Sequence, residues 1–292
     1  MDKPTPTPAS TRVFAAAPAR VGDGFAVHRA LPLRGHDDPH ALEPFLLLDH
    51  AGPTTYGPAA TPRGVGAHPH RGFETVTLAY QGDLAHRDSA GNGGVLNPGD
   101  VQWMTAGRGV VHEEKHGPEL SRHGGTLEMV QLWINVPKRH KREAPRYVDY
   151  RASEFPVLPL GAGGSNFVRL VAGRWGRYVG PAKPYTPLTI ADLYLEAGAE
   201  FDVTLDAAWN SALYPLEGAA DINRTRVASR FIATLTGADR VSVRAATDCH
   251  LLLLSGEPIG EPIAARGPFV MSTEDELTEA MAGFQRGEYG QL

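Results

Sequence analysis

Short extended segments separated by turn signals recur along the chain, and this recurrence constrains the fold more than any other feature. Runs rich in Val, Ile, Leu, Tyr and Phe come about every ten residues, with Gly, Pro or Asn-Gly pairs between them. The 292 residues include 33 glycines and 24 prolines, which fits many short strands joined by tight turns. The pattern predicts an all-β protein built of antiparallel sandwiches or barrels.

The C-terminal segment departs from this pattern. Thr273 and Glu276 have the spacing of a capping box, and Gly287 is a suitable stop for a helix. The apolar residues between them that share one helical face are Leu277, Ala280, Met281 and Phe284. We therefore predict one short C-terminal helix and none elsewhere.

The length is sufficient for two domains, and both halves show the same strand-and-turn texture. We expect a disordered Pro/Thr-rich tail at 1–10, a β-domain at 11–137, a linker at 138–148 and a second β-domain at 149–292. The linker opens with the basic run 138–142. In a chain of net charge −5, this run is more typical of a solvated linker than of a patch for an anionic partner.

Charge and cysteine content restrict the cellular setting. The net charge of −5 gives no reason to expect direct binding to nucleic acid. The single cysteine, Cys249, cannot form an internal disulfide, which favours a reducing, cytoplasmic location, and we expect its thiol to be buried and unreactive. The N-terminus does not resemble a signal peptide, and no run of 18 apolar residues occurs, so no membrane partner is expected.

Two histidines one residue apart, His68 and His70, lie in a strand-like run at 64–80. Side chains at i and i+2 of a strand point the same way, about 6.6 Å apart, so the two imidazoles aim at one point. We expect the same face to continue through Gly72, Glu74 and the apolar residues beyond it. Those residues, Val76, Leu78 and Tyr80, would place the histidines at the mouth of a buried cavity.

His112 and Glu114 form a second pair of this spacing, after a glycine-rich turn and two valines. If the two strands neighbour each other in a barrel, three imidazoles and one carboxylate can meet. Such a donor set suits Fe²⁺, Mn²⁺, Co²⁺, Ni²⁺, Cu²⁺ or Zn²⁺. It suits Mg²⁺ and Ca²⁺ poorly, because they prefer oxygen donors. The second half of the chain has no such pair, so we expect no metal site there.

Three carboxylates compete for the fourth position. Glu113 falls on the opposite face from His112 and is discarded. Glu74 lies about 13 Å beyond His70 along a straight strand, so it reaches the ion only if the chain bends sharply at Gly72. Glu114 needs no such bend and is the predicted ligand, with Glu74 as an alternative ligand or a residue next to the ligands.

Further residues are candidates for the surroundings of the ion. His86 either faces the cavity near the ligands or is half exposed. Trp103 and Met104, together with the apolar residues of 76–80, are candidates for a pocket wall. The competing prediction for each is an ordinary core position.

These motifs together resemble the pirin family. The similar segments are HPHRGFETVT (68–77), LNPGDVQWMTAGRGVVHEE (96–114), LWINVP (132–137) and GEPIGEPIAARGPFVMST (256–273). The resemblance implies a bicupin, with two antiparallel jelly-roll barrels and a short C-terminal helix. It also implies one iron ion in the first cupin, held by His68, His70, His112 and Glu114. Thr105 replaces the proline of the general second cupin motif, a departure that pirins share.

The resemblance implies two kinds of role. Some pirins are quercetin 2,3-dioxygenases, which open the flavonol ring with O₂ and release carbon monoxide. For this chemistry the flavonol would bind through its 3-hydroxyl, the metal would lower that hydroxyl's pKa, and Glu114 would act as the base. The alternative is a non-enzymatic iron-binding regulator that binds a transcription factor or a metabolic enzyme. The expected partners are therefore a flavonol-like small molecule and O₂, or a protein.

Overall fold

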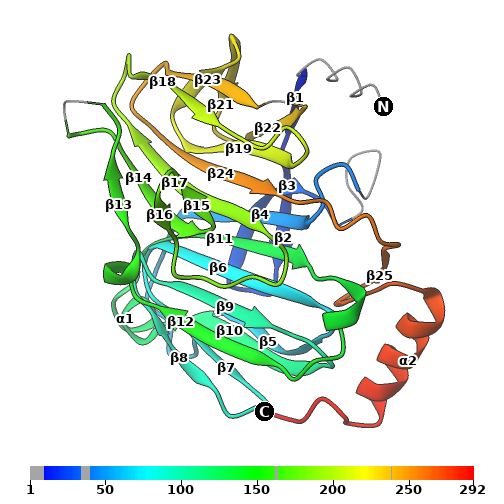
Figure 1. Cartoon of the computed structure of the whole chain (residues 1–292). Helices are drawn as coiled ribbons and strands as arrows, with labels where there is room; N and C mark the ends of the chain where they lie inside the picture. Colours follow the sequence, from blue (N-terminus) through cyan, green and yellow to red (C-terminus); the bar gives the residue numbers. More distant parts are fainter. Residues whose placement is uncertain (1–9, 34–39, 162–163, 238) are drawn as a thin grey trace, which may run out of the picture. The chain divides into compact units, whose positions relative to one another are not determined.

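The structure is a computed structural model, and it describes residues 10–33, 40–161, 164–237 and 239–292. Nearly all regular elements are β-strands, which confirms the predicted all-β class (Figure 1). The chain divides into two compact units. Unit 1 takes the chain up to Ala16, together with His40–Pro44 and Phe155–Pro258. Unit 2 takes Ala17–Pro39, Phe45–Glu154 and Ile259–Leu292.

These units differ from the boundaries expected from the sequence. The expected linker at 138–148 lies inside unit 2, where Arg146–Tyr150 forms strand β12. The C-terminal segment 259–292 also belongs to unit 2, whereas the N-terminal strand β1 (Ser10–Ala15) belongs to unit 1. Backbone pairing decides the assignments of β1, which pairs with β22, and β12, which pairs with β9. The C-terminal segment is assigned by the packing of its apolar side chains against Val111. Of the predicted tail, only Ser10 is among the described residues, and it begins β1.

Unit 2 contains two antiparallel sheets. The larger one has the order β12-β9-β6-β11-β4-β3-β2. Its strands in chain order are β2 (Ala17–Val21), β3 (Phe25–Leu31), β4 (Phe45–Tyr56), β6 (Phe73–Gln81), β9 (Val101–Thr105), β11 (Gly125–Asn135) and β12 (Arg146–Tyr150). The smaller sheet has the order β5-β10-β7-β8. Its strands are β5 (Gly64–His70), β7 (Leu84–Asp88), β8 (Gly93–Leu96) and β10 (Val110–His116).

The core of unit 2 lies between its two sheets. Phe25, Ala79 and Met129 of the larger sheet form one buried apolar cluster with Leu84 and Leu96 of the smaller sheet. Burying this apolar surface holds the sheets face to face, which is the arrangement of a β-sandwich or jelly roll. The short helix α1 (Pro118–His123) was not predicted; it follows β10 and adds Leu120 to the cluster. The unit also contains two single-turn 3₁₀ helices, at Lys138–His140 and Ala152–Glu154.

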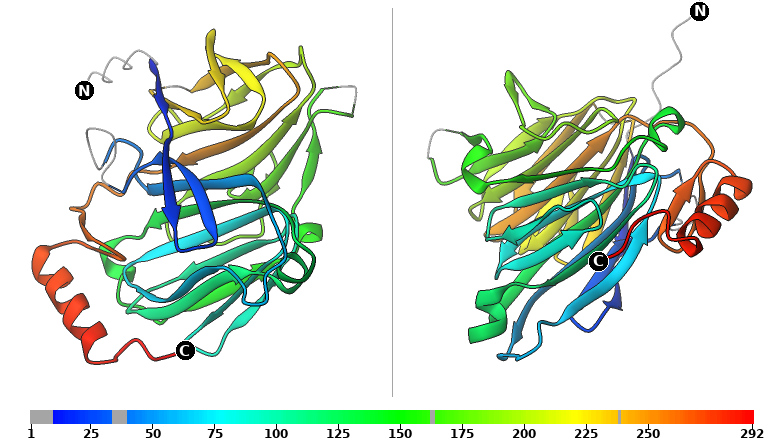
Figure 2. Two further views of the ribbon diagram at one scale, coloured as in Figure 1. Left: turned by 180° about the vertical axis from the view of Figure 1, so that it is seen from behind. Right: turned by 90° about the horizontal axis from the view of Figure 1, so that it is seen from below.

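The C-terminal segment packs against unit 2 as a hairpin and a helix (Figure 2). The hairpin is β25 (Ala264–Arg266) with β26 (Phe269–Met271), and helix α2 spans Glu274–Gln285. The Thr273 hydroxyl accepts a hydrogen bond from Glu276 N at 3.2 Å, as a capping box requires. Leu277 and Ala280 are buried against Val111 of β10.

The predicted helical face is correct for all but one residue. Phe284 is 41% exposed, and the buried position beside it is Gly283. A Cβ at Gly283 would stand 2.8 Å from Glu288 Oε2 and 3.2 Å from the Tyr289 hydroxyl, so the space at this position favours a small residue. The helix stops before Gly287, which has the positive φ of 77° expected of the stop.

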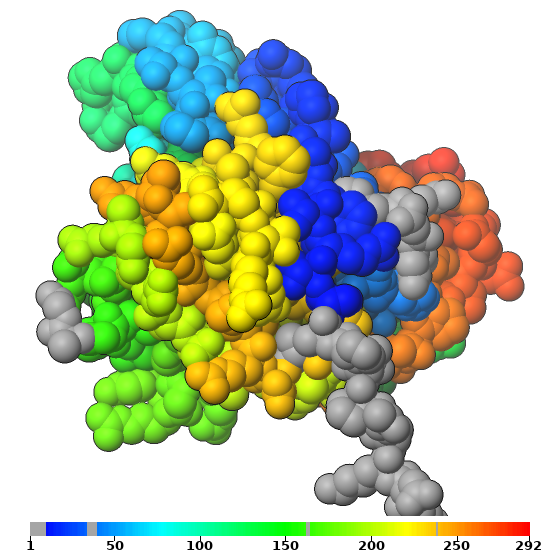
Figure 3. Space-filling view, turned by 90° about the horizontal axis from the view of Figure 1, so that it is seen from above, coloured from blue at the N-terminus to red at the C-terminus, as the bar shows by residue number. Residues whose placement is uncertain are grey.

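Unit 1 repeats the two-sheet plan. Its larger sheet has the order β1-β22-β19-β24-β17-β14-β13, and its smaller sheet the order β18-β23-β20-β21. The strands after β1 are β13 (Val157–Pro159), β14 (Phe167–Ala172), β17 (Leu188–Leu195), β18 (Glu200–Thr204), β19 (Asn210–Glu217), β20 (Ala219–Ile222), β21 (Thr225–Ala228), β22 (Phe231–Thr236), β23 (Arg240–Ala245) and β24 (Cys249–Gly256). A hairpin of β15 (Arg174–Trp175) and β16 (Tyr178–Val179) is added. Figure 3 shows β1 beside the strands of this unit, where it pairs with β22.

Cys249 lies in the core of unit 1, at the start of β24. Burial raises the pKa of its thiol to about 11, so it stays protonated and unreactive at neutral pH, as expected. Neither of the two described helices is long and apolar enough to cross a membrane.

Candidate metal centre

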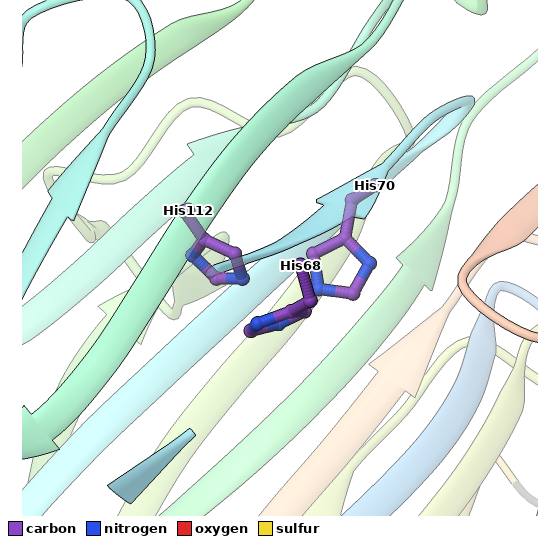
Figure 4. Close-up of side chains that lie close together, drawn as sticks. All are labelled: His68, His70 and His112. Atoms are coloured by element: carbon purple, nitrogen blue, oxygen red, sulfur yellow. The ribbon is translucent and has the colours of Figure 1, made fainter. Parts of the chain in front are cut away.

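Three histidines of unit 2 converge at one point. His68 and His70 lie on β5 and His112 lies on the neighbouring strand β10, where it is the direct cross-strand partner of His68. The ring centroids are 4.3 Å apart for His68 and His112, and 4.8 Å apart for the other two pairs. Figure 4 shows the three rings turned toward one another, and their ligand nitrogens all lie within 4.8 Å of each other.

The hydrogen bonds of these rings fit a bound ion. His68 Nδ1 lies 2.8 Å from Gly66 O and His70 Nδ1 lies 3.4 Å from Pro268 O, so each ring has Nε2 available. His112 is 1% exposed, and neither of its ring nitrogens has a hydrogen-bond partner among the described residues. Buried polar atoms are nearly always paired, so this imidazole fits a position next to an ion.

Protonation also favours metal binding. Burial, followed by the nearby His68, lowers the pKa of His70 to about 3. Burial and the other two rings lower the pKa of His112 well below its ordinary value. Both rings are therefore neutral at pH 7, and neutral imidazole is the form that binds a metal.

Glu114 lies beside this cluster. It follows His112 on the same face of β10, as predicted, and lines the same cavity as His68 and His70. Thr77 Oγ1 lies 3.3 Å from Glu114 Oε1. Burial raises the pKa of the Glu114 carboxyl, against the lowering effects of His68, His86 and Thr77. The group with metal-ligand spacing consists of the three histidines, so ligation by Glu114 stays a prediction.

The other two glutamates point elsewhere. Glu113 forms an ion pair with Arg87, with 2.6 Å between the carboxylate oxygen and Nε, as expected from its opposite face. Glu74 is fully buried on β6 and accepts a hydrogen bond from the Thr105 hydroxyl at 2.7 Å. It does not line the cavity of the three histidines.

The predicted face of the 64–80 run is wrong beyond His70. The run is two strands of different sheets, because β5 ends at His70 and β6 begins at Phe73 after Gly72, which has a φ of 88°. The turn resets the alternation of side chains. Phe73 lies 5.1 Å from His70, ring to ring, and Thr77 contacts Glu114, so the odd-numbered residues of β6 face the site.

The predicted pocket wall is corrected accordingly. The even-numbered residues of β6, which are Glu74, Val76, Leu78 and Tyr80, lie on the opposite face of the sheet. Trp103 is the cross-strand partner of Val76 and shares that face. Met104 packs with Ala106 and Val110 in a separate apolar cluster instead of lining the cavity.

His86 lies next to Glu114, its cross-strand partner on β7. Both residues line a small void of about 10 Å³, on the order of one water. The ring of His86 contacts the Tyr147 hydroxyl and lies 3.4 Å from Asp149 Oδ1. Of the two sequence alternatives for His86, the structure excludes the half-exposed one, since His86 is buried beside Glu114.

His68 and His70 open onto a cavity of about 440 Å³ inside unit 2. Its apolar wall includes Val21, Phe25, Val27, Leu33, Leu47, Val65, Met129 and Trp133. Its polar lining, apart from the predicted residues, includes Arg29, Asp49 and Gln131, while Gly267 and Pro268 come from the C-terminal segment. One sequence pattern could have identified three of these lining residues. Val130, Leu132 and Ile134 form the apolar face of β11, so Met129, Gln131 and Trp133 had to lie on the other face.

Comparison with known proteins gives consistent matches. Residues 24–134 match the family model described as Pirin, and residues 190–290 match the model described as Pirin C-terminal cupin domain. A Pseudomonas aeruginosa protein named "Putative quercetin 2,3-dioxygenase" is 46% identical over 92% of this chain and 93% of its own length. A "Pirin-like protein" of Caulobacter vibrioides is 36% identical over 95% and 98%.

A solved structure agrees with this. The crystal structure of quercetin 2,3-dioxygenase from Acinetobacter baumannii has a TM-score of 0.92 and 40% identity, and the match covers 96% of this chain and 97% of that one. The likeness confirms the predicted bicupin fold with its short C-terminal helix.

Proposed function

This chain belongs to the pirin family, and from that premise we propose that it is a metal-dependent quercetin 2,3-dioxygenase, which opens a flavonol ring with O₂ and releases carbon monoxide. The observation that carries the proposal is the meeting of three imidazoles, two of them buried, beside a cavity that His68 and His70 line. The cavity volume of about 440 Å³ falls in the range of small-molecule sites. The names of the similar proteins point to the same reaction.

His68, His70 and His112 would hold the ion, with Glu114 as the fourth ligand. We propose Fe²⁺ as the native ion, although the donor set suits other first-row divalent metals. When bound, the ion supplies a positive charge that lowers the pKa of a substrate hydroxyl. The reducing cytoplasm, which the lone thiol of Cys249 fits, would keep iron in the ferrous form.

The protein's own residues would position the flavonol and take its proton. Burial raises the pKa of the Glu114 carboxyl in the metal-free protein. In the loaded protein, Glu114 would act as the general base that accepts the proton of the hydroxyl. Its carboxylate lies in the cavity, within reach of a hydroxyl bound beside the histidines. The aromatic and aliphatic wall, with Phe25, Met129 and Trp133, would pack against the flat rings and exclude water.

The test uses protein purified without oxygen and loaded with Fe²⁺. When this protein is mixed with quercetin and then exposed to air, the flavonol absorbance should fall. One molecule of carbon monoxide should be released for each flavonol consumed. Three controls define the result. Metal-free protein and the His112→Ala variant should both be inactive, whereas His123→Ala should keep activity, because its side chain is exposed and away from the site. Fully metal-loaded protein that releases no carbon monoxide would refute the proposal in favour of a regulatory role.

A further inference from the structure

A continuous row of polar side chains crosses the cavity face of the larger sheet of unit 2. Cross-strand pairing aligns Arg29 of β3 with Asp49 of β4, then Gln131 of β11, Thr77 of β6 and Gln102 of β9. Each is the direct partner of the next. Near one end of the row, Thr77 contacts Glu114. At the other end, Arg29 and Asp49 line the same cavity as the histidines.

The rows on both sides of it are mostly apolar. One is formed by Val27, Ala51, Met129 and Ala79, and the other contains Leu47 and Trp133. Most of the polar row is nevertheless buried, since Asp49 is 4% exposed and Thr77 is 2% exposed, whereas Arg29 is only partly buried. An ion pair with a partly exposed partner contributes at most about 1 kcal/mol, so stability accounts poorly for charges at this place. Recognition of a ligand is the role that their shared cavity with the histidines supports.

The Arg29–Asp49 ion pair, at the far end of the row, has hydrogen-bonding groups left for a ligand. Arg29 Nε and Nη2 donate to the two Asp49 oxygens at 2.7 and 2.6 Å. These bonds use two of the five N–H donors of a guanidinium, and the Arg29 side chain keeps 34% of its surface accessible. Because the Asp49 charge cancels that of Arg29, the pair suits a neutral group that both donates and accepts. A phenol hydroxyl is such a group, whereas a carboxylate or phosphate would meet the Asp49 charge.

The row also gives a direction. From β6, where Thr77 contacts Glu114, to β3, which carries Arg29, there are three strand spacings, or about 14 Å. The 3-hydroxyl of a flavonol lies on its central ring. A flavonol held by that oxygen beside the histidines would therefore direct one outer ring along the row toward Arg29 and Asp49, which line the same cavity.

We propose that Arg29 and Asp49 are specificity-determining residues, which bind the phenol hydroxyls of the substrate's outer ring, remote from the metal. This inference rests on the proposed function for the flavonol itself. It adds that the pair discriminates against flavonols without outer-ring hydroxyls.

The experiment measures binding without turnover. Metal-loaded protein is titrated without oxygen with quercetin and with 3-hydroxyflavone, which share the ring system and the 3-hydroxyl but differ in the outer-ring hydroxyls. The natural protein should bind quercetin at least about tenfold more tightly, which corresponds to about 1.4 kcal/mol. The double variant Arg29→Met with Asp49→Leu leaves no unpaired carboxylate, and it should bring the ratio of the two dissociation constants close to one.

Two controls separate recognition from folding. Arg226→Met removes a similar two-bond ion pair with Asp221 in unit 1, and it should keep the natural ratio. The double variant should keep its bound metal and its melting temperature, because apolar side chains replace the pair. An unchanged ratio in a folded double variant, or a natural ratio near one, would overturn the inference.

The same experiment distinguishes this inference from the proposed function. Loss of discrimination in the double variant, together with no carbon monoxide in air, would support the recognition pair and refute the dioxygenase. Carbon monoxide release with an unchanged ratio of dissociation constants would support the dioxygenase and refute the recognition pair. No flavonol binding at all would refute both.

Discussion

His112 lies directly across from His68 in the antiparallel pair of β10 and β5, with their ring centroids 4.3 Å apart. The backbone register therefore fixes the distance between the two rings before any ion binds. His70, two residues from His68 on the same strand, completes the group. A site pre-organised in this way should bind metal without a change of fold.

Removing one ring should abolish tight metal binding. We expect His112→Ala to weaken binding by more than about 100-fold, because residues that only support metal ligands are already worth 10- to 100-fold. Elemental analysis after dialysis against a weak chelator measures the effect. His123→Ala is the matched control on an exposed helical position, and equal metal loss in both variants would contradict the site.

Metal should stabilise the folded protein. The unfolded chain lacks the aligned rings, so binding adds RT ln(1 + [metal]/Kd) to the free energy of unfolding, or about 2.7 kcal/mol at a hundredfold excess over Kd. A thermal melt with and without Fe²⁺, under anaerobic conditions, measures the rise in Tm. His112→Ala should show none of this rise, and a rise of the same size there would place the ion elsewhere.

Acid should destabilise the metal-free protein through the buried rings. The pKa of His70 is lowered to about 3, whereas an unfolded histidine has a pKa of about 6.5. Between these values the unfolded chain binds a proton that the folded chain excludes. The free energy of unfolding is therefore highest above about pH 6.5. It falls with decreasing pH, by about 1.4 kcal/mol per pH unit for one such group.

Denaturant unfolding between about pH 7 and pH 5 measures this slope. The His70→Asn variant removes the titrating ring and should show a shallower dependence. The natural protein and the variant would have the same slope if the ring carried no such effect.

The glycine between the two strands should tolerate no side chain. Gly72 has a φ of 88°, and a Cβ there would lie 2.0 Å from Val270 O. Gly91 has nearly the same φ, 90°, but a Cβ there would meet no atom within 4 Å. We expect Gly91→Ala to cost about 1–2 kcal/mol from strain alone, and Gly72→Ala to cost at least about 2 kcal/mol more.

Urea unfolding of the two variants provides the comparison. Because Gly72 adjoins Arg71 and His70, its alanine variant should also bind metal more weakly. Equal losses of stability in both variants would show that the contact with β26 does not constrain this turn.

Local rules predicted the two ligand pairs, whereas their meeting depends on the pairing of β10 with β5. Alternation along an uninterrupted strand relates His68 to His70 and His112 to Glu114, and it needs no knowledge of the fold. The same rule failed at Val76, because the turn at Gly72 moves the chain into another sheet and restarts the alternation.

Other parts of the site depend on contacts far apart in the sequence. Arg29 comes to the cavity through the register of β3 with β4, and Pro268 reaches His70 from 198 positions away. Neither residue belongs to a motif, so the sequence alone gives no reason to select it. The helix α2 was predicted by its own cap and apolar face, but its assignment to unit 2 depends on packing against Val111.

X-ray absorption at the metal edge tests the central claim most directly. On protein loaded with one equivalent of Fe²⁺ without oxygen, the account predicts a first shell of nitrogen and oxygen donors with the outer-shell scattering of three imidazoles. His68→Ala should reduce that scattering and the bound metal together. A fully loaded ion that shows no imidazole scattering would contradict the account.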